Sequence, residues 1–237
     1  SATSAAYTAS ATKPGRYRAK VFSDGGCEVL SNAATLSSPG YFILQFRGNT
    51  SYTFAALTVG DVNYTYTTKN GLSGSGSFNQ PTFANDNVII STPGVVLGDT
   101  LTLVIEPSNF KRIQISGPIT RGEVFNISQW GSVVWSSMNG AFNNCINLNC
   151  NATDVPNLSE VADMSDMFNL CQKLTGPANI NSWNVSNVTD MSRLFFQAQL
   201  FNQPLNNWNV SNVTNMNAMF QNTFAFNQPL SNWDVSK

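Results

Sequence analysis

Few side chains in this sequence are of a type that does chemistry. The 237 residues include no histidine, so a Ser–His–Asp triad is impossible and the commonest metal ligand is missing. The four cysteines, Cys27, Cys145, Cys150 and Cys171, form no Cys-x-x-Cys pair, and a structural zinc site would need all four thiolates brought together from distant positions. We therefore predict no catalytic residue, no cofactor and no metal site.

Carboxylates gather at Asp154, Glu160, Asp163 and Asp166, a composition that would suit a calcium site or an acid–base pair. Asp163 and Asp166 flank Met164, where we expect a helix to begin, and acidic residues are favourable at a helix N-terminus for structural reasons. We interpret the cluster as structural. Together with the missing histidine, this interpretation predicts that the protein is not an enzyme.

The charge balance argues against two further classes of function. Lys and Arg number 12 and Asp and Glu number 13, a net charge of −1, whereas nucleic-acid binding needs clustered basic residues to displace counterions. No apolar run approaches the roughly 18–20 residues that span a bilayer. We therefore expect no nucleic-acid partner and no membrane insertion. Charged residues make up only 11%, so Asn, Ser and Thr must supply the polar surface.

The first half of the sequence has the pattern of short strands separated by turns. Residues 1–15 are rich in Ser, Ala and Thr and end in the turn signal Lys13-Pro14-Gly15, which predicts a flexible or docking arm. Segments rich in β-branched and aromatic residues follow, and Asn70-Gly71 marks a hairpin. This pattern predicts an all-β, immunoglobulin-like sandwich over residues 16–117.

After residue 117 the sequence repeats itself. Four methionines are separated by 26, 27 and 25 residues, a tryptophan or proline stands eight residues before each, and a phenylalanine stands four residues after. Such periods are typical of stacked repeat units. The repeat positions that we expect to be structural are Trp130, Met138, Phe142, Met164, Phe168, Trp183, Met191, Phe195, Trp208, Met216, Phe220 and Trp233.

The pattern within one unit predicts its secondary structure. Met191, Leu194, Phe195 and Ala198 stand at i, i+3, i+4 and i+7, the spacing of one face of a short helix. Trp208 and the residues after it alternate as a half-buried strand would. We therefore predict an α/β, leucine-rich-repeat-like solenoid with parallel strands over residues 118–237, made of about four repeats.

Two cysteines share a repeat position, because Cys145 and Cys171 each follow the repeat methionine by seven residues. Stacking would place them about one strand spacing apart, inside the roughly 4.4–6.8 Å between Cα atoms that a disulfide allows. A disulfide between them is possible, with Cys150 as a rival partner. The alternative is that both are small buried residues, since Ala198 and Thr223 occupy the same place in later units.

The unit MSRLFFQAQLFNQPLNNWNVSNVTNM, which begins at Met191, resembles the repeat of the BspA-type leucine-rich-repeat surface proteins. The family repeat reads roughly Met-x-x-Met-Phe, then Phe-Asn-x-Pro-Leu, then Trp-Asp/Asn-Val-Ser-x-Val-Thr, and the likeness covers about residues 120–237. The resemblance implies a repeat solenoid on an extracellular cell surface, with a role in adhesion or recognition. It implies no catalytic residues.

These observations give two expectations for function. The first is a surface-exposed adhesion or recognition protein whose repeats bind a protein or a carbohydrate on a host or neighbouring surface. The second is a structural or receptor-binding subunit of a virion or extracellular filament. The sequence stops within a repeat, after Trp233, so we also expect that more chain or a partner covers this uncapped end, with possible self-assembly there and through the N-terminal arm.

Overall fold

The computed structural model describes residues 15–17, 20–22, 28–30, 34–36, 40–84 and 87–237. The chain forms two compact units, Ser1–Pro39 and Gly40–Lys237. In the first unit, the described residues form two short antiparallel pairs, β1 (Gly15–Tyr17) with β4 (Ala34–Leu36) and β2 (Lys20–Phe22) with β3 (Glu28–Leu30). The predicted arm, residues 1–15, lies outside the described residues except for Gly15 in β1.

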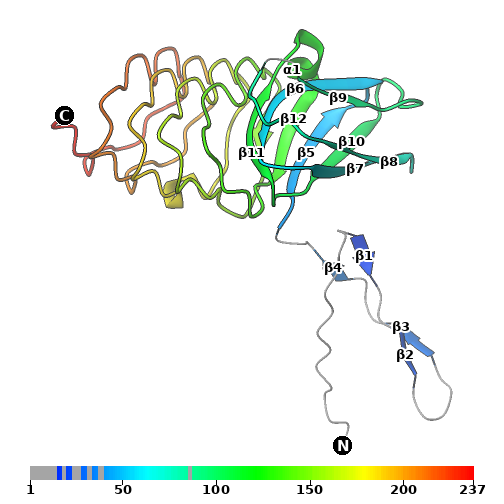
Figure 1. Ribbon diagram of the computed structural model, residues 1–237. Coiled ribbons are helices and arrows are strands. Elements are labelled where there is room, and N and C mark those ends of the chain that lie inside the picture. Colours follow the sequence, from blue (N-terminus) through cyan, green and yellow to red (C-terminus); the bar gives the residue numbers. More distant parts are fainter. Residues whose placement is uncertain (1–14, 18–19, 23–27, 31–33, 37–39, 85–86) are drawn as a thin grey trace, which may run out of the picture. The chain divides into compact units, whose positions relative to one another are not determined.

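Two β-sheets form the first part of the second unit (Figure 1). One has six strands in the order β13-β12-β5-β10-β7-β8, and the other has three in the order β11-β6-β9. All pairs are antiparallel except β12 with β13, so the larger sheet is mixed. The strands are β5 (Phe42–Arg47), β6 (Ser51–Thr58), β7 (Val62–Thr68), β8 (Ser73–Phe78), β9 (Val88–Ser91), β10 (Thr100–Ile105), β11 (Phe110–Ile115), β12 (Val124–Gln129) and β13 (Asn149–Cys150).

Alternation of apolar and polar residues places one face of each sheet in the core. Along β5, Phe42, Leu44 and Phe46 are fully buried while the residues between them are partly exposed. Phe42 of the larger sheet packs against Phe110 of the smaller sheet, with ring centroids 6.1 Å apart. A short helix, α1 (Pro118–Glu123), connects the sheets, and its Thr120 hydroxyl accepts a hydrogen bond from the backbone of Thr53 in β6.

From residue 130 onwards the chain winds into stacked coils, drawn from green to red in Figure 1. The predicted fold class, an immunoglobulin-like sandwich followed by an α/β leucine-rich-repeat-like solenoid with parallel strands, is wrong. The structure is almost all β with a mixed sheet, and described residues 130–237 contain no α-helix. Apart from β13, the coils carry only three isolated parallel bridges and a single 3-10 turn, η1 (Ile180–Ser182).

Left-handed backbone explains why the expected helix does not form. Arg193 and Gln197 have φ values of 53° and 56°, which are outside the right-handed helical region. The apolar residues around them, Met191, Leu194 and Phe195, are still fully buried, as the spacing requires. Each left-handed residue therefore turns the chain back toward the core, and a series of tight turns replaces the predicted helix.

Backbone hydrogen bonds connect the coils in a regular pattern. The N–H groups of Met191, Arg193 and Phe195 donate to carbonyls of the following coil at 2.8–3.0 Å. The intervening N–H groups, such as that of Leu194, close turns within their own coil. The same alternation occurs in the two preceding coils. Other bonds run in the opposite direction, such as that from the N–H of Thr214 to the carbonyl of Thr189 in the preceding coil at 2.8 Å.

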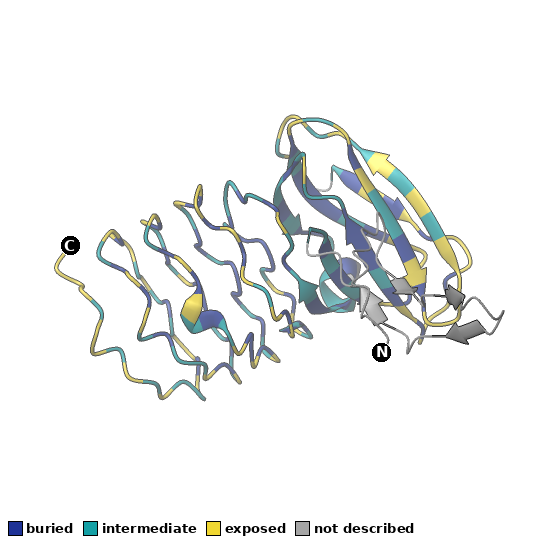
Figure 2. Cartoon of the chain, turned by 90° about the horizontal axis from the view of Figure 1, so that it is seen from below, coloured by how far each residue is buried: buried dark blue, intermediate teal, exposed yellow. Residues whose placement is uncertain are grey.

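The sheets cover the first coil. In β11, Ile115 donates its backbone N–H to the carbonyl of Ala141 at 2.8 Å, and the Arg112 guanidinium reaches the carbonyl of Asn139 at 3.3 Å. On the other side β12 pairs in parallel with β13 of the first coil. The core is therefore continuous from the sheets into the coils, and Figure 2 shows buried residues along the coils up to the last one, which is mostly intermediate or exposed.

Candidate recognition surface and pocket

The repeat positions singled out in the sequence line the inside of the stack. Phenylalanines from four successive coils stack face to face at 5.8, 5.9 and 5.8 Å between ring centroids. The repeat methionines of the first three coils are fully buried, whereas Met216, Phe220 and Trp233 of the last coils are partly buried. Burial and offset stacking of these rings stabilise the coils against one another. The repeat positions of the first three coils are therefore closed to solvent, whereas those of the last coils are partly exposed.

The tryptophans hold neighbouring coils together by hydrogen bonds as well as by packing. Trp208 donates its indole N–H to the carbonyl of Ile180 at 2.8 Å, and Trp233 donates to the carbonyl of Leu205 at 2.9 Å. Each acceptor stands three residues before the tryptophan position of the preceding coil. Trp183 breaks this pattern, because its buried Nε1 has no partner among the described residues.

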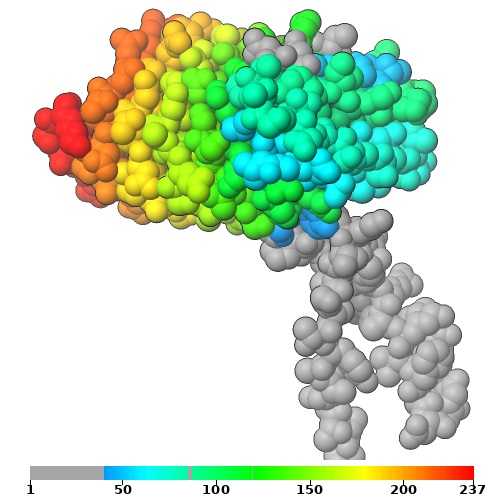
Figure 3. Space-filling view, in the orientation of Figure 1, coloured from blue at the N-terminus to red at the C-terminus, as the bar shows by residue number. Residues whose placement is uncertain are grey.

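Asparagine side chains bridge the coils on the outside of the stack. The amide oxygens of Asn181 and Asn206 accept backbone N–H groups of the next coil at 2.9 Å, and Asn202 does the same. The side-chain N–H groups of Asn187 and Asn212 donate to carbonyls of the preceding coil at 2.8 Å. Much of the asparagine content is thus structural. Figure 3 shows one face of the coils, from residue 130 onwards in green to red.

The carboxylates that could have formed a metal or acid–base site are held apart by structural contacts. Asp154 accepts the backbone N–H groups of Trp130 and Gly131, and Asp163 accepts the N–H and hydroxyl of Ser165. Asp166 forms an ion pair with Arg193 in the next coil. Within the described part of the chain, no three His, Cys, Asp or Glu side chains are grouped to hold a metal ion.

Cys145, Cys150 and Cys171 are free, buried thiols, and no disulfide joins Cys145 to Cys171. The Cys171 thiol instead donates to the carbonyl of Phe142 at 3.2 Å, which fits the alternative that these are small buried residues. Burial raises the pKa of all three thiols, to about 12 for Cys150. The thiols are therefore protonated and unreactive at neutral pH. Cys27 lies outside the described residues.

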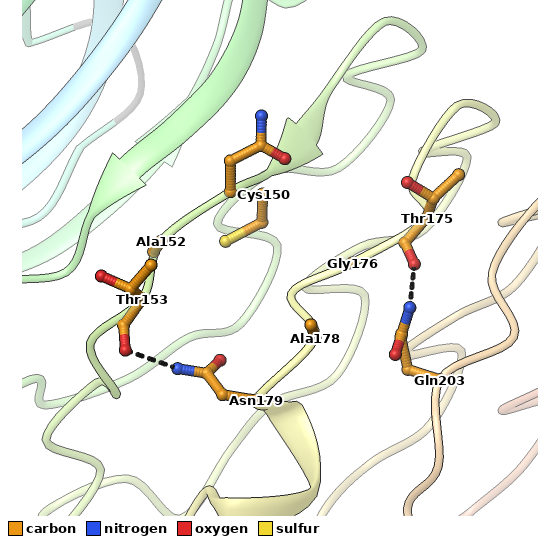
Figure 4. Close-up of a pocket in the computed structure, with 9 residues that line it drawn as sticks. Cys150, Ala152, Thr153, Thr175, Gly176, Ala178, Asn179 and Gln203 are labelled. Carbon is orange, nitrogen blue, oxygen red and sulfur yellow. Dashed lines mark hydrogen bonds between the residues drawn. The ribbon is translucent and has the colours of Figure 1, made fainter.

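A pocket of about 440 Å³ opens on the outside of the stack (Figure 4). One wall is the segment 150–153 and the other is the segment 175–179, with Gln203 of the next coil at the side. Small side chains leave the space, because Ala152 and Ala178 stand on facing walls and Gly176 carries no side chain at all. A Cβ atom on Gly176 would meet the carbonyl oxygen of Cys150 at 2.8 Å, so the walls can approach only with glycine there.

A departure from the repeat length creates the pocket. Leu174 precedes Trp183 by nine residues, whereas Phe201 precedes Trp208 by only seven. The additional residues form the bulge that carries Gly176 and Asn179 and lead into η1. No residue type in the sequence marks this site, and the unequal spacing between equivalent residues is the signal that could have shown it.

Asn179 is the polar group that the bulge introduces into the pocket. Its side-chain N–H groups donate to the carbonyls of Thr153 and Asp154 at 3.1 and 2.9 Å. Trp208 donates its indole N–H to the carbonyl that stands three residues before the equivalent position of the preceding coil. For Trp183 the corresponding carbonyl is that of Thr153, but the side chain of Asn179 donates to it instead. The buried Oδ1 of Asn179 and the indole N–H of Trp183 are left without partners in the described structure. Each unpaired buried group costs about 1–3 kcal/mol, an exception that native proteins tend to keep at functional sites.

Comparison with known proteins finds one sequence family whose model matches most of the coils. Residues 136–237 match the family described as "Mycoplasma protein of unknown function, DUF285". No curated protein and no solved structure matches the chain. Among the described residues, no helix has the length and apolar character needed to cross a bilayer.

Proposed function

We propose that the chain is a surface-exposed adhesion or recognition protein whose stacked coils bind a protein or a glycan. The observation that carries the proposal is that different side chains in the coils stabilise the stack and form its outer surface. The aromatic side chains and most carboxylates hold the stack together, and neutral amides and hydroxyls face outward. Such a surface offers hydrogen bonds to a partner without presenting a reactive group.

The resemblance of the repeat unit to BspA-type leucine-rich-repeat surface proteins supports the same proposal, and the family match covers the same coils. We place the protein on an extracellular cell surface on this ground. Immunogold electron microscopy with an antibody against residues 118–237 tests the location. Label on the cell envelope is the expected result, and label confined to the cell interior would contradict it.

The binding role is tested with the whole chain. Microspheres coated with the protein are washed over host cells, immobilised matrix proteins and immobilised glycans, and attachment is counted against microspheres coated with the heat-unfolded protein. We expect the folded protein to attach to at least one of these surfaces under shear. If the folded protein attaches to none of these surfaces more than the unfolded control does, the proposal is wrong.

A second candidate is a structural or receptor-binding subunit of a virion or filament. Its support is the repetition of equivalent backbone hydrogen bonds between successive coils, because a coil with the same donor and acceptor pattern can add to a stack without a change of register. Sedimentation velocity over a wide range of concentrations separates the two candidates. A monomer whose sedimentation coefficient does not change with concentration contradicts assembly and favours the recognition role.

A further inference from the structure

We propose that the pocket between segments 150–153 and 175–179 binds a neutral sugar residue. The proposal rests on the recognition function proposed above and assigns it a site and a class of ligand. Its basis is the pocket's unpaired acceptor, its uncharged lining and the hydrogen bonds that already occupy several backbone groups of its walls.

The unpaired acceptor is fixed in position before any ligand arrives. Both side-chain N–H groups of Asn179 are held by carbonyls of the opposite wall, so the amide cannot turn over without placing its oxygen against those carbonyls. Oδ1 is therefore left as a buried acceptor with no donor among the described residues. Less than 1 Å² of Oδ1 is open to solvent, so a ligand hydroxyl reaches it only when a neighbouring group of the wall shifts. That contact would remove the cost of burying an unpaired oxygen.

Other groups around the pocket can bond to hydroxyls. The Thr153 hydroxyl and the Asn151 side chain are exposed and make no hydrogen bond to another described residue. Gln203 donates its Nε2 to the carbonyl of Thr175 at 2.6 Å, which leaves its Oε1 free as an acceptor. Donors and acceptors are thus mixed around a floor that includes Cys150 and Ala152. A sugar ring, with hydroxyls at its edge and C–H groups on its faces, has the matching chemistry.

Charged ligands fit the pocket less well. None of the described lining residues carries a charge, so a phosphate or carboxylate would find no cation and a metal ion no anion. The nearby Asp154 carboxylate is committed to the backbone of Trp130 and Gly131.

A peptide that binds by strand addition fits less well, because several backbone groups of the walls are already used. The N–H of Asn151 donates to Ile127, the N–H of Gly176 donates to the side chain of Asn149, and the carbonyls of Thr153 and Thr175 accept side-chain amides. Strand addition requires an unpaired edge. The volume of about 440 Å³ lies within the range of small-molecule sites, roughly 300–1,000 Å³.

The test is saturation-transfer NMR on the full chain with a panel of methyl glycosides. The neutral probes are the glucoside, galactoside, mannoside and N-acetylglucosaminide, and the comparison probes are sialic acid, glucose 6-phosphate and tetra-alanine. Ala178→Phe places a ring in the pocket from an exposed position. Ala162→Phe makes the same change at an exposed alanine outside the pocket and serves as the matched control. Thr153→Val removes one hydroxyl with little change of shape.

We expect at least one neutral glycoside to bind the wild type and Ala162→Phe equally, and to lose its signal with Ala178→Phe. Thr153→Val should weaken binding about three- to tenfold, the effect of one neutral hydrogen bond. Unchanged binding by Ala178→Phe, or binding of the charged or peptide probes alone, would overturn the proposal. So would the absence of any glycoside signal from wild-type protein with an intact one-dimensional proton spectrum.

The microsphere assay separates failure of this site from failure of the proposed function. If Ala178→Phe attaches to surfaces as well as Ala162→Phe, recognition stands and the pocket is not its site. If the wild type binds a glycoside but attaches to no surface, the pocket proposal stands and the adhesion role fails.

Discussion

Arg193 and Asp166 occupy the same position in neighbouring coils, and the arginine reaches back to the aspartate through two hydrogen bonds of 2.8 and 2.7 Å. Both have left-handed backbone, with φ values of 53° and 57°. The position therefore combines local strain with a bond between coils. The two effects act in opposite directions on stability, and substitutions can measure them separately.

Removal of the ion pair should have a small effect. Arg193→Met keeps most of the length of the side chain but loses the charge, and the arginine is 53% exposed. We expect the free energy of unfolding to fall by less than about 1 kcal/mol, with a smaller difference at high salt. Urea denaturation at low and high sodium chloride measures both values. A loss of stability that does not depend on salt would show that it comes from the packing of the side chain and not from its charge.

The strain should be visible at Ala218, which has φ 54° at the equivalent position of the last complete coil. The first coil has Gly140 there, with φ 62°. Because a left-handed non-glycine residue costs roughly 1–2 kcal/mol, Ala218→Gly should raise the free energy of unfolding, by about 0.5–1 kcal/mol after the entropy lost by glycine.

Ala162→Gly is the matched control for this change, because Ala162 is an exposed alanine without positive φ. It should lower the free energy of unfolding by up to about 1 kcal/mol. Thermal unfolding of both variants gives the comparison. Changes of the same sign in the two variants would contradict the interpretation of strain.

The indole N–H should contribute more to the free energy of unfolding at Trp208 than at Trp183. Trp208→Phe removes one of two donors to the carbonyl of Ile180, which keeps the backbone N–H of Trp183, whereas Trp183→Phe removes a donor that has no partner in the described structure. Both variants lose similar volume at buried sites. We expect Trp208→Phe to be the more destabilising by about 1 kcal/mol in urea denaturation. Equal losses would mean that Trp183 also forms a hydrogen bond in solution.

The buried thiols predict a loss of stability in alkaline solution. The Cys150 thiol has an ordinary pKa of 9.0, and burial raises it to about 12 in the folded chain. Between these values the unfolded chain releases the proton while the folded chain keeps it. The free energy of unfolding therefore falls as pH rises, by about 1.4 kcal/mol per pH unit for each such group.

Cys150→Ala should make this fall shallower, whereas its effect near pH 7 should be modest. Tyr52, whose pKa burial also raises to about 12, adds to the slope above pH 10 in both proteins. Urea denaturation from pH 8 to pH 11 gives the two slopes. Parallel slopes for the wild type and Cys150→Ala would show that this thiol is not protected from ionisation by the fold.

The sequence predicted the repeat length and the buried side chains but not the backbone between them. Met191, Leu194, Phe195 and Ala198 point inward, as a helical spacing requires. The same spacing also fits two tight turns with a left-handed residue in each. Glycine usually marks such residues, but here they are Arg193 and Gln197, so the local signal was absent.

The pocket could not be read from the residue types either. Gly176, Ala178 and Asn179 are ordinary loop residues, and none carries reactive chemistry. Their significance comes from the longer segment between Leu174 and Trp183, in which Asn179 donates to the carbonyls of Thr153 and Asp154 and its Oδ1 has no donor among the described residues. Only the arrangement of three coils together shows which amide oxygen lacks a donor.

The repetition of the bonds between coils also bears on how such a chain can change in length over evolution. Equivalent positions donate and accept in successive coils, as when the N–H groups of Gly140, Asp166 and Arg193 all donate to the following coil. Duplication or deletion of one whole regular coil therefore brings matching donors and acceptors together again. The array can therefore grow or shrink in whole-coil steps, while an altered loop within one coil can acquire a new specificity without disturbing the others.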